Sequence, residues 1–319
     1  MEDVNAEHLL DVFTSIDANS DTVWDVCFHF LEHLVWYKVR QTVLRPKIEA
    51  LPDGHHSKPK CLFKLSRLFQ RVGNWEESRR LLTHTLQLER RSGDSCRVAE
   101  TLRLLCTTNR LLGRYDEGIQ QAKEALGIYE RLHDTTGQAN CWNKLAFTLI
   151  ADGQSEAAED AAFRAINLAS ETGQESLVCE SHQALGRIYR YTGEAEKAVR
   201  HLQTGLEIAS TFNRHDLLFD LRYSLVLVWL YQGRLNDASS HIEQAKLHVA
   251  DNLYNLGKAM EMQAEIRYRQ RRLEDAKSEA LGAREIFRNL GAVWRAESCS
   301  DYLWRIEQAT ETHSTMFQN

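Results

Sequence analysis

Glycine recurs every forty residues through the middle of this chain, at Gly73, Gly113, Gly153, Gly193 and Gly233. A leucine stands eight residues before each of these glycines, and a small residue stands five residues after each. A fixed period of this length is typical of proteins built from stacked structural repeats. We therefore expect a core that extends in one dimension, in which each repeat packs only on its neighbours.

A sixth copy of the pattern follows after 38 residues, with Arg271 at the glycine position and Gln263 at the leucine position. Each copy predicts two helices. In the third copy the first helix is expected over 135–151, and Gly153 ends it because glycine readily adopts the left-handed conformation that terminates helices. The second helix carries alanines at spacings of three and four residues, which would let two helix axes approach closely.

All three prolines lie between residues 46 and 59, on either side of Asp53-Gly54. We expect 45–59 to be a loop or linker that no helix crosses, because proline and Asp-Gly pairs favour turns. The predicted organisation is an N-terminal helical segment with this linker over 1–58, a repeat array over 59–291, and a capping helix with a disordered polar tail over 292–319. The capping helix should end near residue 309 and cover the last apolar face.

Six segments, one at the turn of each copy, resemble tetratricopeptide (TPR) repeats: VGNWEES, LGRYDEG, DGQSEAA, TGEAEKA, QGRLNDA and QRRLEDA. The family's usual repeat has about 34 residues, and the longer repeat here is similar to the branch found in kinesin light chain. The family's repeat-ending proline is missing. The resemblance covers about 59–291 and implies an all-α fold, a right-handed α-solenoid of about six TPR helical hairpins plus a C-terminal capping helix, with an N-terminal helical segment.

Residues 30–72 also resemble the junction that precedes the TPR arrays of fungal STAND-type NTPases, which are switch proteins with NACHT or NB-ARC domains. This second resemblance implies an alternative role, as the sensor or regulatory module of such a signalling protein. The surface of 21–58 would then contact the NTPase domain.

The composition is ordinary for a globular chain, with 43% hydrophobic and 26% charged residues and a net charge of −6. We expect no nucleic-acid binding because of this charge, and no membrane span because no apolar run approaches about 20 residues. Seven cysteines occur without a C-x-x-C pair, which favours small buried thiols in a reducing compartment. The expected location is cytoplasmic.

The motifs of common catalytic and cofactor sites are missing from the sequence. It contains no G-x-x-x-x-G-K-S/T, G-x-G-x-x-G, H-E-x-x-H or G-x-S-x-G segment. We therefore expect a non-catalytic protein with no cofactor and no metal. His55-His56 beside Asp53 could hold a metal ion, but a solvated turn is the favoured interpretation.

Four positions of each first helix line the concave face in TPR arrays, and in the first four copies they hold six basic and two acidic residues. A basic groove in an acidic chain favours an acidic protein or peptide partner, because arginine binds carboxylates through a bidentate fork. The alternative is that these arginines only solvate a surface. The residues expected to bind the partner are Lys60, Arg67, Arg103, Arg110, Asn140, Asn143, Lys144, Arg187, Arg190, Tyr223 and Tyr231.

The carboxylate clamp of chaperone-binding TPR proteins is not expected in this groove. Lys144 fits one of its positions, but the positions for the other lysine and asparagine side chains hold different residues. These are Phe63, Arg67, Leu104 and Asn140. A partner's C-terminal carboxylate is therefore not the expected ligand.

Aromatic residues near the C-terminal end have two possible roles. Tyr223 and Tyr231 could seat an apolar anchor of the partner, or could pack against a neighbouring helix. Trp294 and Trp304 could belong to the core or to an interface between copies, which leaves the oligomeric state open. The function favoured by the whole sequence is a protein–protein interaction scaffold that binds an acidic protein segment in the concave groove.

Overall fold

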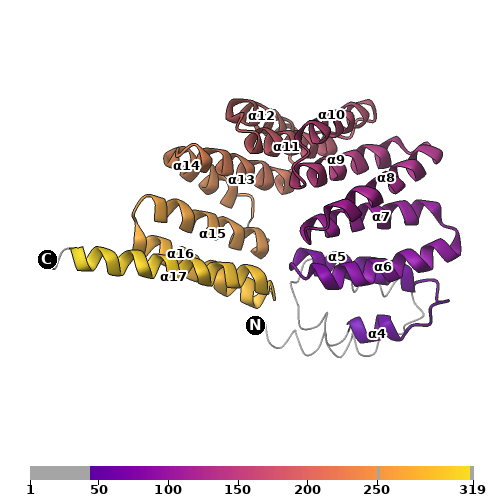
Figure 1. The fold of residues 1–319 in the computed structure, drawn as a ribbon, viewed down its shortest axis with the longest axis horizontal. Helices are drawn as coiled ribbons and strands as arrows, with labels where there is room; N and C mark the ends of the chain where they lie inside the picture. The colour runs from indigo at the N-terminus through magenta and orange to yellow at the C-terminus, as the bar shows by residue number, and fades with distance from the viewer. Residues whose placement is uncertain (1–43, 250–251, 317–319) are drawn as a thin grey trace.

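The computed structural model describes residues 44–249 and 252–316, and every regular element in these ranges is a helix (Figure 1). The helix expected after residue 20 lies outside the described residues. The helices are α4 (Arg45–Ala50), α5 (Lys58–Arg71), α6 (Trp75–Ser92), α7 (Ser95–Leu111), α8 (Tyr115–Arg131), α9 (Thr135–Ala151), α10 (Ser155–Glu171), α11 (Glu175–Tyr191), α12 (Ala195–Thr211), α13 (His215–Tyr231), α14 (Leu235–Lys246), α15 (Leu253–Arg269), α16 (Leu273–Asn289) and α17 (Val293–Met316).

The first helix of each repeat ends at the predicted glycine position. Gly73 and Gly153 have φ angles of 81° and 85°, in the left-handed region that favours glycine. Past Gly153, the backbone N–H of Gln154 donates to the Leu149 carbonyl oxygen at 2.9 Å, which satisfies an acceptor left over at the helix end. Arg271 takes the same conformation in the sixth copy, with φ of 63°. The sequence period is therefore the period of a helix–turn–helix unit.

The helices pair into successive hairpins, from α5–α6 to α15–α16, and α17 packs on α16. Ala158, Ala162 and Ala165 of α10 are fully buried, as their spacing predicted. The first helices α7, α9 and α11 contact one another directly, more closely than the second helices of successive hairpins do. Helices on the inner side of a curved stack lie closer together, so the first helices form the concave face of the arc (Figure 1). The expected all-α solenoid is confirmed.

Residues 45–59 are not the continuous loop that the prolines suggested. The helix α4 occupies part of this stretch and α5 begins at Lys58, each with a proline in its first turn. Proline is tolerated there because the N–H groups of a first turn have no partner within the helix. The buried Lys58 Nζ donates to the Leu51 carbonyl oxygen at 2.5 Å and to Asp53 Oδ1 at 2.9 Å. These bonds tie the end of α4 to the start of α5.

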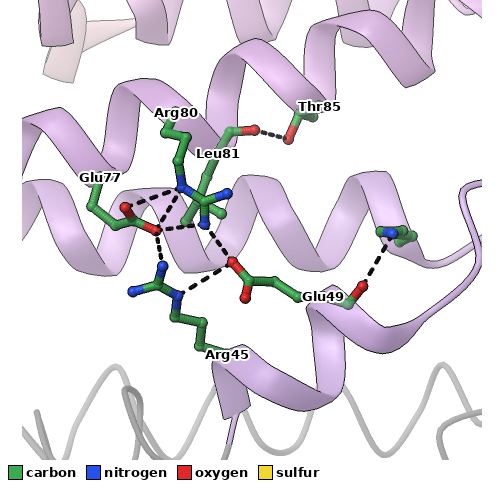
Figure 2. A network of polar contacts seen from close by, with 7 residues as sticks. Arg45, Glu49, Glu77, Arg80, Leu81 and Thr85 are labelled. Atoms are coloured by element: carbon green, nitrogen blue, oxygen red, sulfur yellow. Dashed lines mark hydrogen bonds and ion pairs between the residues drawn. The ribbon is translucent and has the colours of Figure 1, made fainter.

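An ion-pair network fixes α4 on α6 (Figure 2). Arg45 donates from Nε to Glu49 Oε1 at 3.2 Å, and its Nη2 lies 3.0 Å from Glu77 Oε1. Arg80 donates from Nε to Glu77 Oε1 at 3.0 Å and also pairs with Glu49. Each carboxylate is thus shared by two arginines. Because charges in such networks support one another more than isolated surface pairs do, α4 is held as an extension of the first hairpin.

The last helix is longer than expected. α17 continues to Met316, so residues 310–316, predicted to lie in a disordered tail, are helical. No glycine or proline follows Gly291 to end the helix. Its inward residues are buried as expected and cover the final hairpin; they are Ala296, Cys299, Leu303 and Ile306.

The two ends of the arc meet through tryptophan side chains. The ring centroids of Trp75, at the start of α6, and Trp294, at the start of α17, lie 5.1 Å apart. Trp294 is therefore engaged within the chain, whereas Trp304 is 63% exposed on the outside of α17. The concave face is consequently bounded at both ends of the solenoid.

Candidate functional site

A cavity of about 460 Å³ opens on the concave face between α11, α13, α15 and α17. Three of the predicted groove residues, Arg190, Tyr223 and Tyr231, line it together with Leu227 and Leu230. Tyr231 is 68% exposed. Burial raises the pKa of Tyr223 to about 12, so its hydroxyl stays protonated at neutral pH. This cavity offers aliphatic and aromatic surface with phenol hydroxyls available as hydrogen-bond donors.

Most of the charges around this cavity are compensated. Arg295 is ion-paired with Glu261 and donates from Nε to the Tyr254 hydroxyl at 3.0 Å. Glu265 accepts hydrogen bonds from Arg269 Nε and from the Tyr302 hydroxyl, each at 2.5 Å. Because these arginines already have acidic partners, this end of the groove favours an apolar part of a ligand.

The middle of the groove has a different electrostatic character. Arg110 on α7 and Arg187 on α11 both approach the ring of Phe147 on α9, with guanidinium carbons 5.9 and 5.1 Å from its centroid. Two of the predicted groove residues thus meet at one aromatic ring.

Three other predicted groove residues are engaged within the chain. Lys144 Nζ donates to Glu180 Oε2 at 2.6 Å, and Asn143 Nδ2 donates to the same oxygen at 3.1 Å. Asn140 Nδ2 donates to the Thr136 carbonyl oxygen of its own helix at 3.1 Å. These side chains are less available to a partner than their register position suggested.

The N-terminal part of the predicted set does not line the cavity. Arg67 is exposed on α5, and Lys60 is half-buried near the start of the same helix. Arg103 on α7 lies near Tyr129, where burial raises the tyrosine pKa to about 12 and the nearby guanidinium partly opposes that rise. These three residues extend the basic character of the array toward its N-terminal end.

Sequence reasoning missed the contribution of α17. Arg295, Tyr302 and Arg305 line the cavity, although α17 was expected only to cover the last hairpin. Carrying the repeat register forty residues beyond Glu265 reaches Arg305, so this position could have been found. The Arg305 guanidinium carbon lies 5.2 Å from the Tyr302 ring centroid.

The described part of the chain has neither a cluster of metal ligands nor a helix that could span a membrane. Within 44–249 and 252–316, no three His, Cys, Asp or Glu side chains meet in an arrangement that could hold a metal ion. His55 and His56 stack with centroids 4.7 Å apart, and His55 Nδ1 accepts a hydrogen bond from the Ser57 backbone N–H at 3.2 Å. Every helix in these ranges is too short or too polar to traverse a bilayer.

The repeats match a known family. Residues 61–131, 97–171 and 137–211 each match the tetratricopeptide repeat family. This stretch is an array of tetratricopeptide repeats. The hairpins α13–α14 and α15–α16 continue the TPR architecture beyond it. No curated protein sequence matches the chain.

Solved structures similar to this chain include three of different kinds, and the first two share its fold. A Rap protein complexed with Competence and Sporulation Factor has a TM-score of 0.64 and 14% identity, over 90% of this chain and 84% of that one. A STAND protein with a TPR sensor from Pyrococcus horikoshii has a TM-score of 0.56 and 14% identity, over 92% of this chain and 50% of that one. A putative kinesin light chain from Podosopora anserina has a TM-score of 0.47 and 18% identity, over 61% of this chain and 95% of that one. At these identities the likeness concerns the fold alone.

Proposed function

We propose that this chain is a non-catalytic protein-binding scaffold, and that its concave groove holds a partner segment carrying acidic and apolar side chains. The observation that carries the proposal is that the groove has a basic part and an apolar part. Two arginines with no acidic partner among the described residues, Arg110 and Arg187, lie on α7 and α11. A tyrosine- and leucine-lined cavity lies between α11 and α17. Such a surface suits a segment with a carboxylate-bearing part and an apolar anchor.

The comparisons support a binding role for a fold of this kind. TPR repeats are associated with protein–protein interaction, and the Rap protein that shares the fold was solved in a complex with Competence and Sporulation Factor. The acidic character of the partner is inferred from the arginines of this groove. Because helices held in an array make a rigid concave wall, binding would require little rearrangement of the first helices.

Charge reversal tests the groove. The variant with Arg103, Arg110 and Arg187 all changed to Glu should capture no partner from a lysate of the source organism, while far-ultraviolet circular dichroism shows unchanged helix content. A matched control reverses Arg90, Arg164 and Arg200, which are exposed on the second helices α6, α10 and α12. Captured proteins are identified by mass spectrometry. Equal partner capture by the wild type and the groove variant would reject the groove as the binding site.

A second function, the sensor module of a STAND-type signalling protein, is favoured by a separate observation. The STAND protein that shares the fold carries a TPR sensor, and this chain spans about half of that protein's length. The docked helix α4 extends the array on its N-terminal side, and the surface of 21–58 would contact the NTPase domain. A phosphate-loop coding segment in frame upstream of the gene would support this function, and a stop codon there would count against a fused NTPase.

A further inference from the structure

Two arginines, one from the second hairpin and one from the fourth, approach the same aromatic ring of the third hairpin in the middle of the groove. Arg110 comes from α7 and Arg187 from α11, and Phe147 stands between them on α9. Phe147 is 9% exposed, so most of its ring is covered. An aromatic face attracts a guanidinium and orients its plane without using its N–H groups. The N–H edges of both arginines are thus left for another partner.

Neither guanidinium has a counter-charge among residues 44–249 and 252–316. In this part of the chain the side chains of Arg110 and Arg187 make no ion pair and no hydrogen bond. The acidic residue of the same groove region, Glu180, is already bound by Lys144 and Asn143. Several other groove cations do have acidic partners, as in the ion pair between Lys258 and Asp220 at 3.2 Å.

The electrostatic potential around these arginines is therefore positive. Burial, together with the charges of Arg110 and Arg190, lowers the pKa of Arg187 to about 10, and burial lowers the pKa of Arg110. Both groups nevertheless remain charged at neutral pH. Holding like charges together in a half-buried place destabilises the free protein. An arrangement of this kind is expected where a ligand supplies the missing negative charge.

We propose that Arg110 and Arg187, oriented by Phe147, form a binding site for an oxyanion of the bound segment, either a side-chain carboxylate or a phosphate group. Arginine suits both groups because its fork donates two parallel hydrogen bonds to a pair of oxygens. Arg190 lies one turn along α11 and lines the tyrosine-lined cavity. The anionic group of the segment therefore lies next to its apolar anchor. That the anion belongs to a protein segment rests on the proposed function.

Inorganic phosphate and acetate serve as probes of the site itself. In thermal unfolding at constant ionic strength, millimolar anion should raise the Tm of the wild type by about 2 °C relative to sodium chloride. The double variant Arg110→Gln with Arg187→Gln should lose this shift. A larger shift with phosphate than with acetate indicates a phosphorylated segment, and comparable shifts indicate Asp or Glu. Equal shifts in wild type and double variant, or none in either, would overturn the site.

Stability without anion separates a ligand site from a structural contact. If the arginines serve a ligand, the double variant should unfold at the same temperature as the wild type or higher, because the repulsion is removed. A lower Tm would mean that the two arginines stabilise the fold and do not serve a ligand. Arg164→Gln is the matched control, since Arg164 stacks on Trp142 at 4.9 Å but is exposed and paired with Asp160 at 2.8 Å. This variant should keep the full response to anion.

The anion experiment and the capture experiment can fail separately. Suppose that anion raises the Tm in an arginine-dependent way but the charge-reversal variant still captures the partner. This result would reject the proposed function and keep the oxyanion site. Loss of capture without an anion shift would reject the oxyanion site and leave the scaffold function.

Discussion

The indole ring of Trp294 lies against Gly73, so that the last helix of the solenoid contacts the turn of its first hairpin. A Cβ atom at residue 73 would overlap the indole nitrogen. Trp75, two residues farther along, adds a ring contact to the same tryptophan. Gly73 therefore meets two requirements, since its φ angle of 81° also favours glycine. The contact joins the last helix to a hairpin that lies more than two hundred residues earlier in the chain.

Gly73→Ala should open this contact. Alanine at a positive φ angle costs about 1 kcal/mol of stability, and its methyl group would also displace the indole of Trp294. We expect the radius of gyration from small-angle X-ray scattering to increase, because the two ends of the arc separate.

Gly113→Ala is the control for backbone strain. Gly113 has a φ angle of 73°, but nothing lies within 4 Å of the place its Cβ would take. This variant should also lose about 1 kcal/mol of stability through its positive φ angle. It should keep the radius of gyration of the wild type. Equal radii for both alanine variants would show that the Trp294 contact does not hold the ends together.

The shared carboxylates at α4 predict a local effect of Arg80→Gln. This change removes one arginine from both Glu49 and Glu77 (Figure 2). We expect faster amide hydrogen exchange over 45–51, with global stability lowered by about 1 kcal/mol or less. Arg90→Gln, which removes a single exposed pair with Glu124, should leave exchange in α4 unchanged. The same exchange in α4 for both variants would argue against the network.

The pH dependence of α4 docking follows from Glu49. Burial raises the pKa of this carboxyl, but the hydrogen bonds and charges of Arg80 and Arg45 outweigh burial and leave the pKa below its usual value. The stabilisation of α4 docking is therefore present above the pKa that Glu49 has in the unfolded chain. It is lost as pH falls through the pKa of Glu49 in the folded protein. Exchange in α4 should accelerate on acidification in the wild type, and less so in Arg80→Gln.

The turns and helix faces could be predicted because they depend on local requirements. Gly153 marks a helix end since the left-handed backbone there disfavours side chains, and the buried Ala158 and Ala162 show their role through spacing alone. The same register predicts concave positions for Arg110 and Arg187, and both side chains approach the ring of Phe147. A one-dimensional stack makes each such inference local to one repeat and its neighbours.

Other features depend on quantities that no local pattern records. The contact of Trp294 with Gly73 results from rotation accumulated over six hairpins. The engagement of Asn143 and Lys144 by Glu180 depends on a choice of rotamers between two helices. A register shows that these side chains share a face but leaves open whether they bind one another or a partner.

A half-buried histidine pair predicts a loss of stability in acid. His182 and His201 approach with their Nδ1 atoms 3.1 Å apart, and burial followed by the charge of His201 lowers the pKa of His182 to about 4. The folded protein keeps His182 neutral, whereas the unfolded chain takes up a proton below its ordinary value of 6.5. The unfolded state thus binds more protons between these values, so stability falls as pH decreases through this window.

The size of this effect can be isolated by comparing pH slopes. From pH 7 to pH 5 the wild type should lose about 1 kcal/mol through this histidine, after allowance for partial exposure. Urea unfolding of His182→Gln at both pH values should show a smaller loss. Other titrating groups contribute equally to both proteins, so identical losses would mean that His182 is not the responsible group.

Arg271 occupies the one position of the six-fold pattern where glycine is replaced, and its backbone still takes a φ angle of 63°. The exposed side chain gains little there, while a left-handed conformation costs a non-glycine residue about 1–2 kcal/mol. Arg271→Gly should therefore raise the free energy of unfolding by about 1 kcal/mol, after the greater freedom of glycine in the unfolded chain is subtracted. The neighbouring change Arg272→Gly should lower it, since that residue has a φ angle of −91° and donates to Asp275 Oδ2 at 2.6 Å. In denaturant unfolding, the two variants should change the free energy of unfolding in opposite directions if the backbone conformation decides the outcome. Changes in the same direction would point to the loss of a positive charge instead.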